Sequence, residues 1–259
     1  MYSVTKRVEM IKQPCGGYLK TGMFVREDYN DGIVLNGNEN IDPSIVGLAV
    51  DYLTRYLSGL SAEEAFRISL LGATRLDIYR GTKQEKKKAL ELIKKVDGMS
   101  DESIISACML AGYDVCFRAS CDDYRQNGLI PDEYSISNIR NMVERSCNFF
   151  LNEGEITKTN ITFEGGYTDI ISSGDADYLT PNGLWDMKVS KHDITADYTL
   201  QLLVYYLMGL KSDPDTFKSI SKLGFFNPRK NISYWTDVSF IPQSVISIVK
   251  REIIGYMDD

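Results

Sequence analysis

The spacing of the apolar residues changes near residue 153, and this change constrains the fold more than any other feature of the chain. Between residues 39 and 152, apolar residues recur every three or four positions, as they do on one face of an α-helix. After residue 153, short stretches with the repeat of β-strands alternate with helical stretches. The sequence therefore predicts an α+β protein, in which a helical part is followed by a compact mixed core.

Three stretches follow from this change of period, and they form either separate parts or one integrated domain. Residues 1–38 are broken by glycines and are predicted to form loops with a strand or hairpin. Residues 39–152 are predicted to contain helices at 45–56, 61–79, 82–96, 100–124 and 135–152, and Ser61 and Glu64 form a capping box. Residues 153–259 are predicted to contain strands at 156–179, 184–189, 222–227 and 232–241, with helices at 194–210 and 242–256.

Composition and charge narrow the classes of protein. No run of about 18 apolar residues is present, and the first ten residues lack the core of a signal peptide, so a cytoplasmic protein is expected. The net charge of −7 argues against a protein that passively coats nucleic acid, although a local basic patch can still hold phosphate. The cysteines are odd in number and include no C-x-x-C pair; they are Cys15, Cys108, Cys116, Cys121 and Cys147. Reduced thiols packed mostly in helices are expected, with a metal or iron–sulfur site as the alternative.

Two aspartates lie on strands that a tight turn joins. If Thr180 and Gly183 close a two-residue loop, Leu179 pairs with Leu184 and Asp177 lies opposite Asp186. The two Cβ atoms are then about 5 Å apart on one face of the sheet. Carboxylates this close repel each other unless a cation lies between them, and Mg²⁺ or Mn²⁺ suits oxygen ligands. A glycine bulge in the turn would instead shift the register by one residue.

Lys188 lies two residues after Asp186, so both side chains are expected on one face of the strand, opposite Trp185 and Met187. That charged face is either solvated or part of a site. An ammonium group beside the aspartates could help to deprotonate a metal-bound water and could stabilise charge on a phosphate. In the following helix, Gln201 and Tyr205 are four residues apart and share a face. They belong either to the wet edge of an amphipathic helix or to the site.

The order Gly174-x-x-Asp177, Asp186-x-Lys188, Gln201-x-x-x-Tyr205 resembles the successive motifs of RecB-like and lambda-type exonucleases in the PD-(D/E)XK nuclease superfamily. The resemblance implies a restriction-endonuclease-like core, a mixed central sheet flanked by helices. It also implies a magnesium- or manganese-dependent deoxyribonuclease, with Asp177 and Asp186 as metal ligands and Lys188 as the catalytic lysine. Gln201 and Tyr205 would support the site. No iron–sulfur cluster of the kind found in some of these nucleases is expected, because no cysteine follows Cys147.

The family also supplies an acidic residue or a histidine from an upstream helix. Glu144 is the preferred candidate for this catalytic and metal-ligating position, with Glu155 and Glu164 as alternatives. The single histidine, His192, follows the lysine and cannot fill it. Asp175 lies two residues before Asp177 and is expected to support the site rather than to compete as a ligand.

Two further stretches carry positive charge. The lysines Lys83, Lys86, Lys87, Lys88, Lys94 and Lys95 are predicted to form a solvated helix face, with a patch for a nucleic-acid backbone as the alternative. The stretch 225–230 joins two phenylalanines to an arginine and a lysine. It is predicted to be the end of a strand, with contact to single-stranded DNA as the alternative.

The resulting hypothesis is a nuclease that hydrolyses phosphodiester bonds of DNA, either single-stranded or at duplex ends. An exonuclease in recombination, repair or the biology of phages and mobile elements fits best, with a protein partner or a second copy as further partners. The alternative is a catalytically silent nuclease-like fold that binds nucleic acid or protein. A third hypothesis is a purely helical regulator, in which the helices of 39–152 carry the function.

Overall fold

The computed structural model describes residues 1–257, and the chain divides into two compact units. The sheet unit comprises Met1–Tyr29 and Phe149–Asp259, and the helical unit comprises Asn30–Asn148. The boundary expected at residue 152 lies close to the second junction. The N-terminal residues, expected as a stretch of their own, instead pack within the sheet unit up to Tyr29.

The sheet unit is built on one mixed six-stranded sheet. Its strands follow the order β2 (Val25–Asp28), β8 (Ile232–Asp237), β7 (Lys222–Asn227), β6 (Gly183–Met187), β5 (Ala176–Leu179) and β3 (Lys158–Ile161). β6 and β7 are parallel, and every other pair of neighbours in this sheet is antiparallel. A separate parallel pair joins β1 (Tyr2–Ser3) to β4 (Ile171–Ser173). Helices flank the six-stranded sheet, so the predicted α+β class with a mixed central sheet is confirmed.

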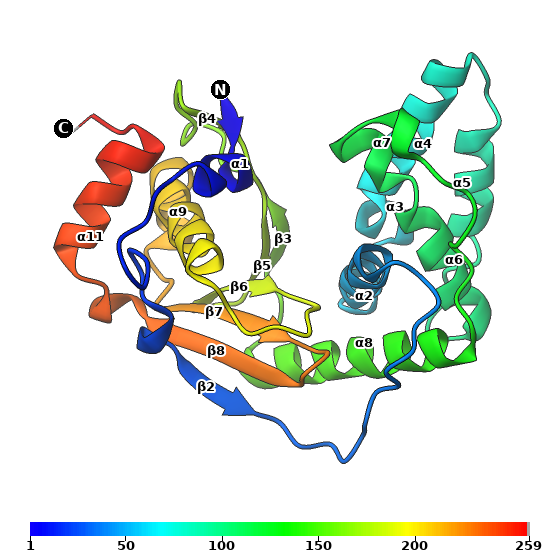
Figure 1. Cartoon of the computed structure of the whole chain (residues 1–259), viewed down its shortest axis with the longest axis horizontal. Coiled ribbons are helices and arrows are strands. Elements are labelled where there is room, and N and C mark those ends of the chain that lie inside the picture. The colour runs from blue at the N-terminus through cyan, green and yellow to red at the C-terminus, as the bar shows by residue number, and fades with distance from the viewer. Residues whose placement is uncertain (258–259) are drawn as a thin grey trace. The chain divides into compact units, whose positions relative to one another are not determined.

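Both faces of the sheet are covered. On one face lies α9 (Ala196–Ser212), with α1 (Val4–Glu9) and α11 (Gln243–Ile248) beside it (Figure 1). α11 continues as a π-helix over Val249–Ile254, and α10 (Pro214–Phe217) follows α9. On the other face, the Phe149 ring stacks on Phe226 at 4.2 Å and meets Trp185 edge-on at 4.9 Å. β6 is therefore buried along its whole length, including the face that carries its charges.

The helical unit contains the helices expected from the spacing of apolar residues. They are α2 (Pro43–Leu57), α3 (Ala62–Ala65), α4 (Arg67–Arg80), α5 (Glu85–Ile93), α6 (Asp101–Ala111), α7 (Asp114–Arg118) and most of α8 (Glu133–Glu153). The capping box of Ser61 and Glu64 is present at the start of α3, and the Ser100 hydroxyl caps α6. Within residues 1–257, no helix is long and apolar enough to cross a membrane.

A buried carboxylate joins α4 to α5. Asp77 accepts hydrogen bonds from the Thr82 hydroxyl (2.6 Å) and from the backbone N–H groups of Glu85 (3.0 Å) and Lys86 (2.9 Å). Burial acts to raise the pKa of Asp77, but these hydrogen bonds outweigh it and lower the pKa to about 2. The carboxylate thus satisfies two N–H groups at the start of α5 that the helix itself leaves without acceptors.

Several predicted elements are shorter than expected, because tertiary packing interrupts them. The helix predicted at 61–79 is divided at Phe66, whose fully buried ring lies 5.2 Å from Tyr52. The helix predicted at 100–124 ends at Ala111 and resumes as α7 and a 3₁₀ turn over Cys121–Asp123. Between 156 and 179, loops separate β3, β4 and β5. The Tyr167 hydroxyl organises them, because it accepts a hydrogen bond from the Phe163 N–H and donates one to the Gly174 carbonyl.

The ends of the sheet unit also differ from the prediction. Loops and a strand were expected over 1–38, but that stretch also contains the helix α1 and a 3₁₀ turn over Thr21–Met23. The strand predicted at 232–241 ends at Asp237, and Val238–Phe240 form a 3₁₀ turn. Asp237 accepts a hydrogen bond from the Ser239 N–H and thereby caps that turn.

Candidate active site

The turn between β5 and β6 sets the register of the candidate site. Leu179 pairs with Leu184 and Tyr178 with Trp185, and the Thr180 N–H donates to the Gly183 carbonyl at 2.9 Å. This is the two-residue loop predicted from the sequence, without a shift of the register between β5 and β6. The ladder ends at the pair Tyr178–Trp185. Because side chains alternate along a strand, Asp177 and Asp186 lie on the same face as Leu179 and Leu184, which pack with the leucines of α9.

Asp177 lies directly before the last pair of the ladder, Tyr178 with Trp185. One of its carboxylate oxygens, Oδ2, accepts a hydrogen bond of 3.0 Å from the backbone N–H of Met187. Asp186 is only 5% exposed, so its carboxylate is held away from bulk water. A buried carboxylate is costly unless a cation or hydrogen-bond donors stabilise it, and its surroundings therefore decide what it can bind.

Lys188 provides one such cation. Its Nζ lies 2.7 Å from Asp186 Oδ2 and 4.8 Å from the centre of the Tyr198 ring. Burial acts to lower the pKa of Lys188, but the charges of Asp186 and Asp177 outweigh burial and raise it. The two carboxylates thus create a potential negative enough to keep a buried ammonium group protonated.

Helix α9 brings Gln201 and Tyr205 to the same region. The Gln201 Nε2 donates to the Tyr205 hydroxyl at 3.0 Å and to Thr5 Oγ1, on α1, at 2.9 Å. Burial, followed by the charges of Asp186, Asp175 and Asp177, raises the pKa of Tyr205 well above its usual value. The phenol therefore stays protonated beside the carboxylates, and its O–H is available as a donor.

Gly174 allows these elements to approach one another. A Cβ atom at this position would lie 2.6 Å from Val4 Cγ2 and 3.3 Å from Tyr205 Cε1. Both neighbours are buried, so neither can move aside without disturbing the packing of α1 on α9. The glycine of the Gly174-x-x-Asp177 motif thus has a packing role next to the carboxylates.

The two aspartates are of the residue type that binds divalent metal ions, but there are only two of them. Asp177 and Asp186 offer hard, anionic oxygen donors of the kind that Mg²⁺ and Mn²⁺ prefer. Their negative potential already stabilises one cation, the Lys188 ammonium group. Among residues 1–257, no three Asp, Glu, His or Cys side chains are grouped closely enough to hold a metal ion. Two aspartates therefore fit the ion by type and charge, without a third acidic ligand from the described residues.

The three candidates for the upstream acid are all exposed side chains. Glu144 is an exposed residue of α8 within the helical unit, and Glu155 is exposed in the loop before β3. Glu164 is also exposed and accepts a hydrogen bond from the Thr162 hydroxyl. His192 is exposed in the loop after Lys188, as expected.

The stretch 225–230 does not offer aromatic rings to a ligand. Phe225 and Phe226 are both buried in the core of the sheet unit, and Lys230 is ion-paired with Asp193. The alternative of a surface for single-stranded DNA built on these rings is therefore wrong. The stretch is the end of β7, as the sequence mainly predicted.

Two residues of the site were not identified from the sequence. Thr5 comes from the unpredicted helix α1, for which the signal was the spacing of Val4, Val8 and Ile11 after the favoured N-cap residue Ser3. Tyr198 lies in the first turn of α9, and only the folded chain brings its ring to Lys188. No family model, curated protein or solved structure matches this chain.

Proposed function

We propose that the chain is a metal-dependent nuclease that hydrolyses phosphodiester bonds of DNA. The observation that carries the proposal is the convergence of Asp177, Asp186 and Lys188 on one buried face of the sheet, beneath Gln201 and Tyr205 of α9. A merely structural ion pair would need one carboxylate. A second carboxylate on the same face, partly satisfied by the Met187 N–H, favours a cation of higher charge than the ammonium group.

The charge of each side chain indicates its role in the proposed reaction. Asp177 and Asp186 would hold a divalent cation, which when bound supplies Lewis-acid activation of the phosphate and of the attacking water. Lys188 can donate to a phosphate oxygen and offset the negative charge that develops there. Tyr205 remains a neutral donor, and Gln201 fixes the position of its hydroxyl.

The helix α1 completes the support. Thr5 accepts a hydrogen bond from Gln201, while the Gln13 amide donates to Asp197, in the first turn of α9, at 2.7 Å. The N-terminal segment thus holds α9 at two points along its length. Such fixation supports preorganised donors, because catalysis by fixed dipoles and charges depends on positions held within a fraction of an ångström.

The test measures metal binding and cleavage with the same full-length protein. Calorimetric titration with Mn²⁺ and cleavage of end-labelled linear DNA should both be lost in Asp186→Asn. Lys188→Met should lose cleavage while keeping Mn²⁺ binding. Matched controls, Asp169→Asn and Lys191→Met, change exposed residues of the same types and should behave like the wild type.

Two outcomes would overturn the proposal. One is a folded protein that binds no Mn²⁺ and cleaves neither linear nor circular DNA. The other is cleavage that survives both Asp186→Asn and Lys188→Met, since a contaminating nuclease would behave in this way. Mn²⁺ or DNA binding without any cleavage would favour the catalytically silent alternative.

A further inference from the structure

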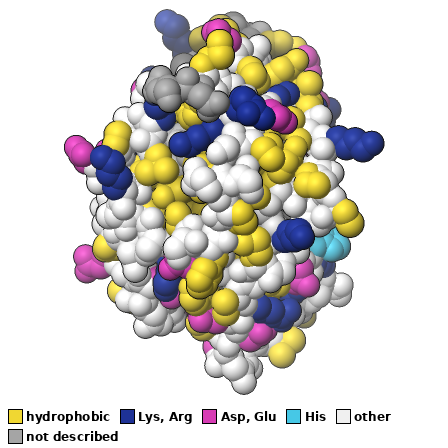
Figure 2. All heavy atoms as spheres, turned by 90° about the vertical axis from the view of Figure 1, so that its left-hand side faces the viewer, with side chains coloured by type: hydrophobic (Ala, Val, Ile, Leu, Met, Phe, Trp, Pro, Cys, Tyr) yellow, Lys and Arg dark blue, Asp and Glu magenta, His cyan; other side chains and the backbone are white. Residues whose placement is uncertain are grey.

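Positive charge in the helical unit is concentrated on α5 and the turns beside it. Residues 83–95 contain six exposed lysines, namely Lys83, Lys86, Lys87, Lys88, Lys94 and Lys95, against two glutamates, in a chain whose net charge is −7. Lys88 is paired with Glu85 and Lys95 with Glu102, and no ion pair is found for the other four within the described chain. By contrast, lysines and arginines on the face in Figure 2 are interspersed with acidic and apolar side chains.

Four of these lysines lie in two rows along α5 (Glu85–Ile93) and the turn that follows it. Ala89 and Ile93 face the core, and Lys88 and Lys95 lie to one side of them, seven residues apart. Lys87 and Lys94 form a parallel row that faces solvent, with the same spacing. Seven residues are two turns, or about 10 Å along a helix, so the two backbone positions of each row lie about that far apart; Lys94 and Lys95 directly follow Ile93, the last residue of α5.

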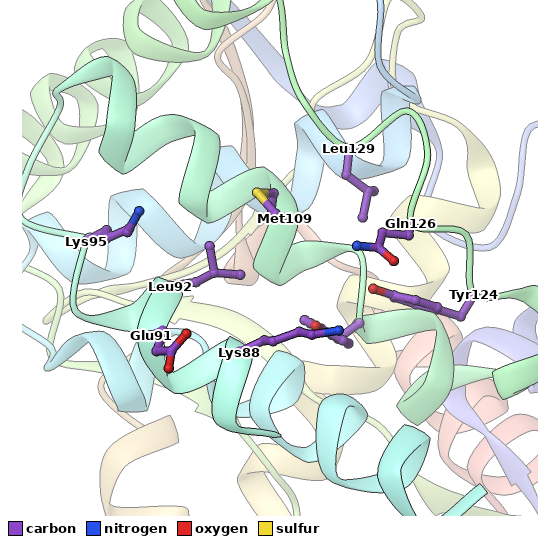
Figure 3. Close-up of a pocket in the computed structure, with 9 residues that line it drawn as sticks. Lys88, Glu91, Leu92, Lys95, Met109, Tyr124, Gln126 and Leu129 are labelled. Carbon is purple, nitrogen blue, oxygen red and sulfur yellow. The ribbon is translucent and has the colours of Figure 1, made fainter. Parts of the chain in front are cut away.

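A small cavity opens beside the first row. It has a volume of about 210 Å³, and its lining combines apolar Leu92, Met109 and Leu129 with the polar side chains Lys88, Glu91, Lys95, Tyr113, Tyr124 and Gln126. Figure 3 shows Lys88 and Lys95 at opposite sides of Leu92, with Gln126 and Tyr124 across from Lys88. The cavity is smaller than the roughly 300 Å³ at which sites for drug-sized molecules begin, so one flat ring is a suitable occupant.

The aromatic wall of this cavity is held in place from several sides. The rings of Tyr113 and Tyr124 stack at 5.2 Å with an angle of 13° between them, and the Arg80 guanidinium lies 5.4 Å from the centre of the Tyr124 ring. The Tyr113 hydroxyl donates to Glu85 at 2.9 Å. A wall fixed in this way does not need to be ordered when a ligand enters.

We propose that α5 and the adjoining cavity bind single-stranded DNA. Lys87 and Lys94 contact backbone phosphates, and one unpaired base enters the cavity between Leu92 and Leu129. In the cavity, the Lys88 ammonium group and the Gln126 amide form hydrogen bonds with the polar edge of that base. A duplex keeps its bases paired and stacked, so it can use only the lysines. The choice of DNA rests on the proposed nuclease function, whereas the binding itself does not require cleavage.

The experiment measures binding in EDTA, so that cleavage cannot interfere. Fluorescence anisotropy with the full chain and a labelled dT20 strand compares the wild type with Lys87→Glu/Lys94→Glu. The matched control is Lys211→Glu/Lys218→Glu, which changes the net charge equally at two exposed lysines with the same spacing in the sheet unit. We expect the first pair to raise the Kd at least about tenfold and to reduce the slope of log K against log salt by about 1.4. The control should change the Kd less than about twofold.

The cavity is tested separately with a strand of the same length that lacks bases. The wild type should bind this abasic strand and a 20-base-pair duplex more weakly than dT20, and Leu92→Trp, which fills the cavity, should remove the preference. Gln126→Ala gives a second variant at an exposed position, should the larger side chain disturb folding.

The outcomes separate the two proposals. Equal binding of dT20 by the wild type and Lys87→Glu/Lys94→Glu overturns the inference, even if the protein cleaves DNA. Equal binding of dT20 and the abasic strand by the wild type overturns the role of the cavity. Lysine-dependent binding of dT20 by a protein that never cleaves DNA supports the inference and contradicts only the nuclease proposal.

Discussion

Replacing Lys188 by methionine tests whether the ammonium group balances the two carboxylates. The Lys188 side chain is 23% exposed and that of Asp186 is 6% exposed, so their 2.7 Å ion pair is largely screened from water. Removing one partner of such a pair leaves an uncompensated buried charge, and we expect a loss of about 3 kcal/mol in the free energy of unfolding. For a unit of this size, that corresponds to a fall in Tm of about 10 °C.

Manganese should reverse much of this loss. Without the ammonium group, the carboxylates of Asp177 and Asp186 have a stronger need for a cation, and Mn²⁺ no longer competes with Lys188. A ligand present at about 100 times its Kd stabilises a folded protein by about 2.7 kcal/mol. The Tm of Lys188→Met should therefore rise more steeply with Mn²⁺ than that of the wild type, even though the proposed cleavage would be lost.

The assay can follow the sheet unit alone, because the two tryptophans, Trp185 and Trp235, both lie in it. Thermal unfolding is recorded by tryptophan fluorescence in EDTA and in increasing Mn²⁺, with Lys191→Met as the control. A Tm of Lys188→Met equal to that of the wild type in EDTA would refute the reasoning about the buried pair. Equal responses to Mn²⁺ in the two proteins would refute the competition between the metal and the ammonium group.

Three further predictions concern single contacts. Asp77→Ala should cost the helical unit about 3 kcal/mol, since it removes three hydrogen bonds to a buried carboxylate. Because the pKa of Asp77 is lowered, its contribution to stability is complete above about pH 4 and is lost as the pH falls toward 2. Acid titration followed by circular dichroism at 222 nm should therefore show a smaller loss of stability with falling pH in Asp77→Ala than in the wild type. Thr5→Val should lower the kcat of the proposed cleavage about fivefold, because it removes the hydrogen bond that Thr5 accepts from the Gln201 amide of α9, whereas Thr5→Ser should retain the activity; equal loss in both variants would contradict this role. Gly224→Ala should destabilise the sheet unit by about 2 kcal/mol or more, because its Cβ would lie 2.1 Å from the buried Trp185 ring, while Gly22→Ala, which meets nothing within 4 Å, should unfold at the same urea concentration as the wild type.

Local signals in the sequence identified the parts of the fold that depend on neighbouring residues. The strand at 222–227 was predicted with its observed bounds, because its apolar residues sit between clear turn signals. The turn between Thr180 and Gly183 set the predicted pairing of Leu179 with Leu184, and hence the face of the sheet that Asp177 shares with Asp186. Register in a hairpin follows from the length of its loop, so it can be read without knowledge of the rest of the chain.

Contacts between distant residues decided the remainder. The alternation of side chains along β6 placed Asp186 and Lys188 on one face, but it left open whether water or protein covers that face. In the structure α9 covers this face and brings Tyr198 and Tyr205 to it. The hydrogen bond from Gln201 to Thr5 joins residues 196 positions apart and depends on a helix of six residues. So short a helix is not stable by itself, and packing against α9 is what forms it.

The sequence by itself thus determined the composition of the site, an α+β chain with two aspartates and a lysine on paired strands. Only the tertiary structure decided that Asp186 is buried with Asp177 and Lys188 half-buried beside it, which cation balances it, and that the first ten residues belong to their support. The physical reason is that side-chain periodicity and turn geometry are local, whereas burial and electrostatic potential are sums over everything that packs around a group.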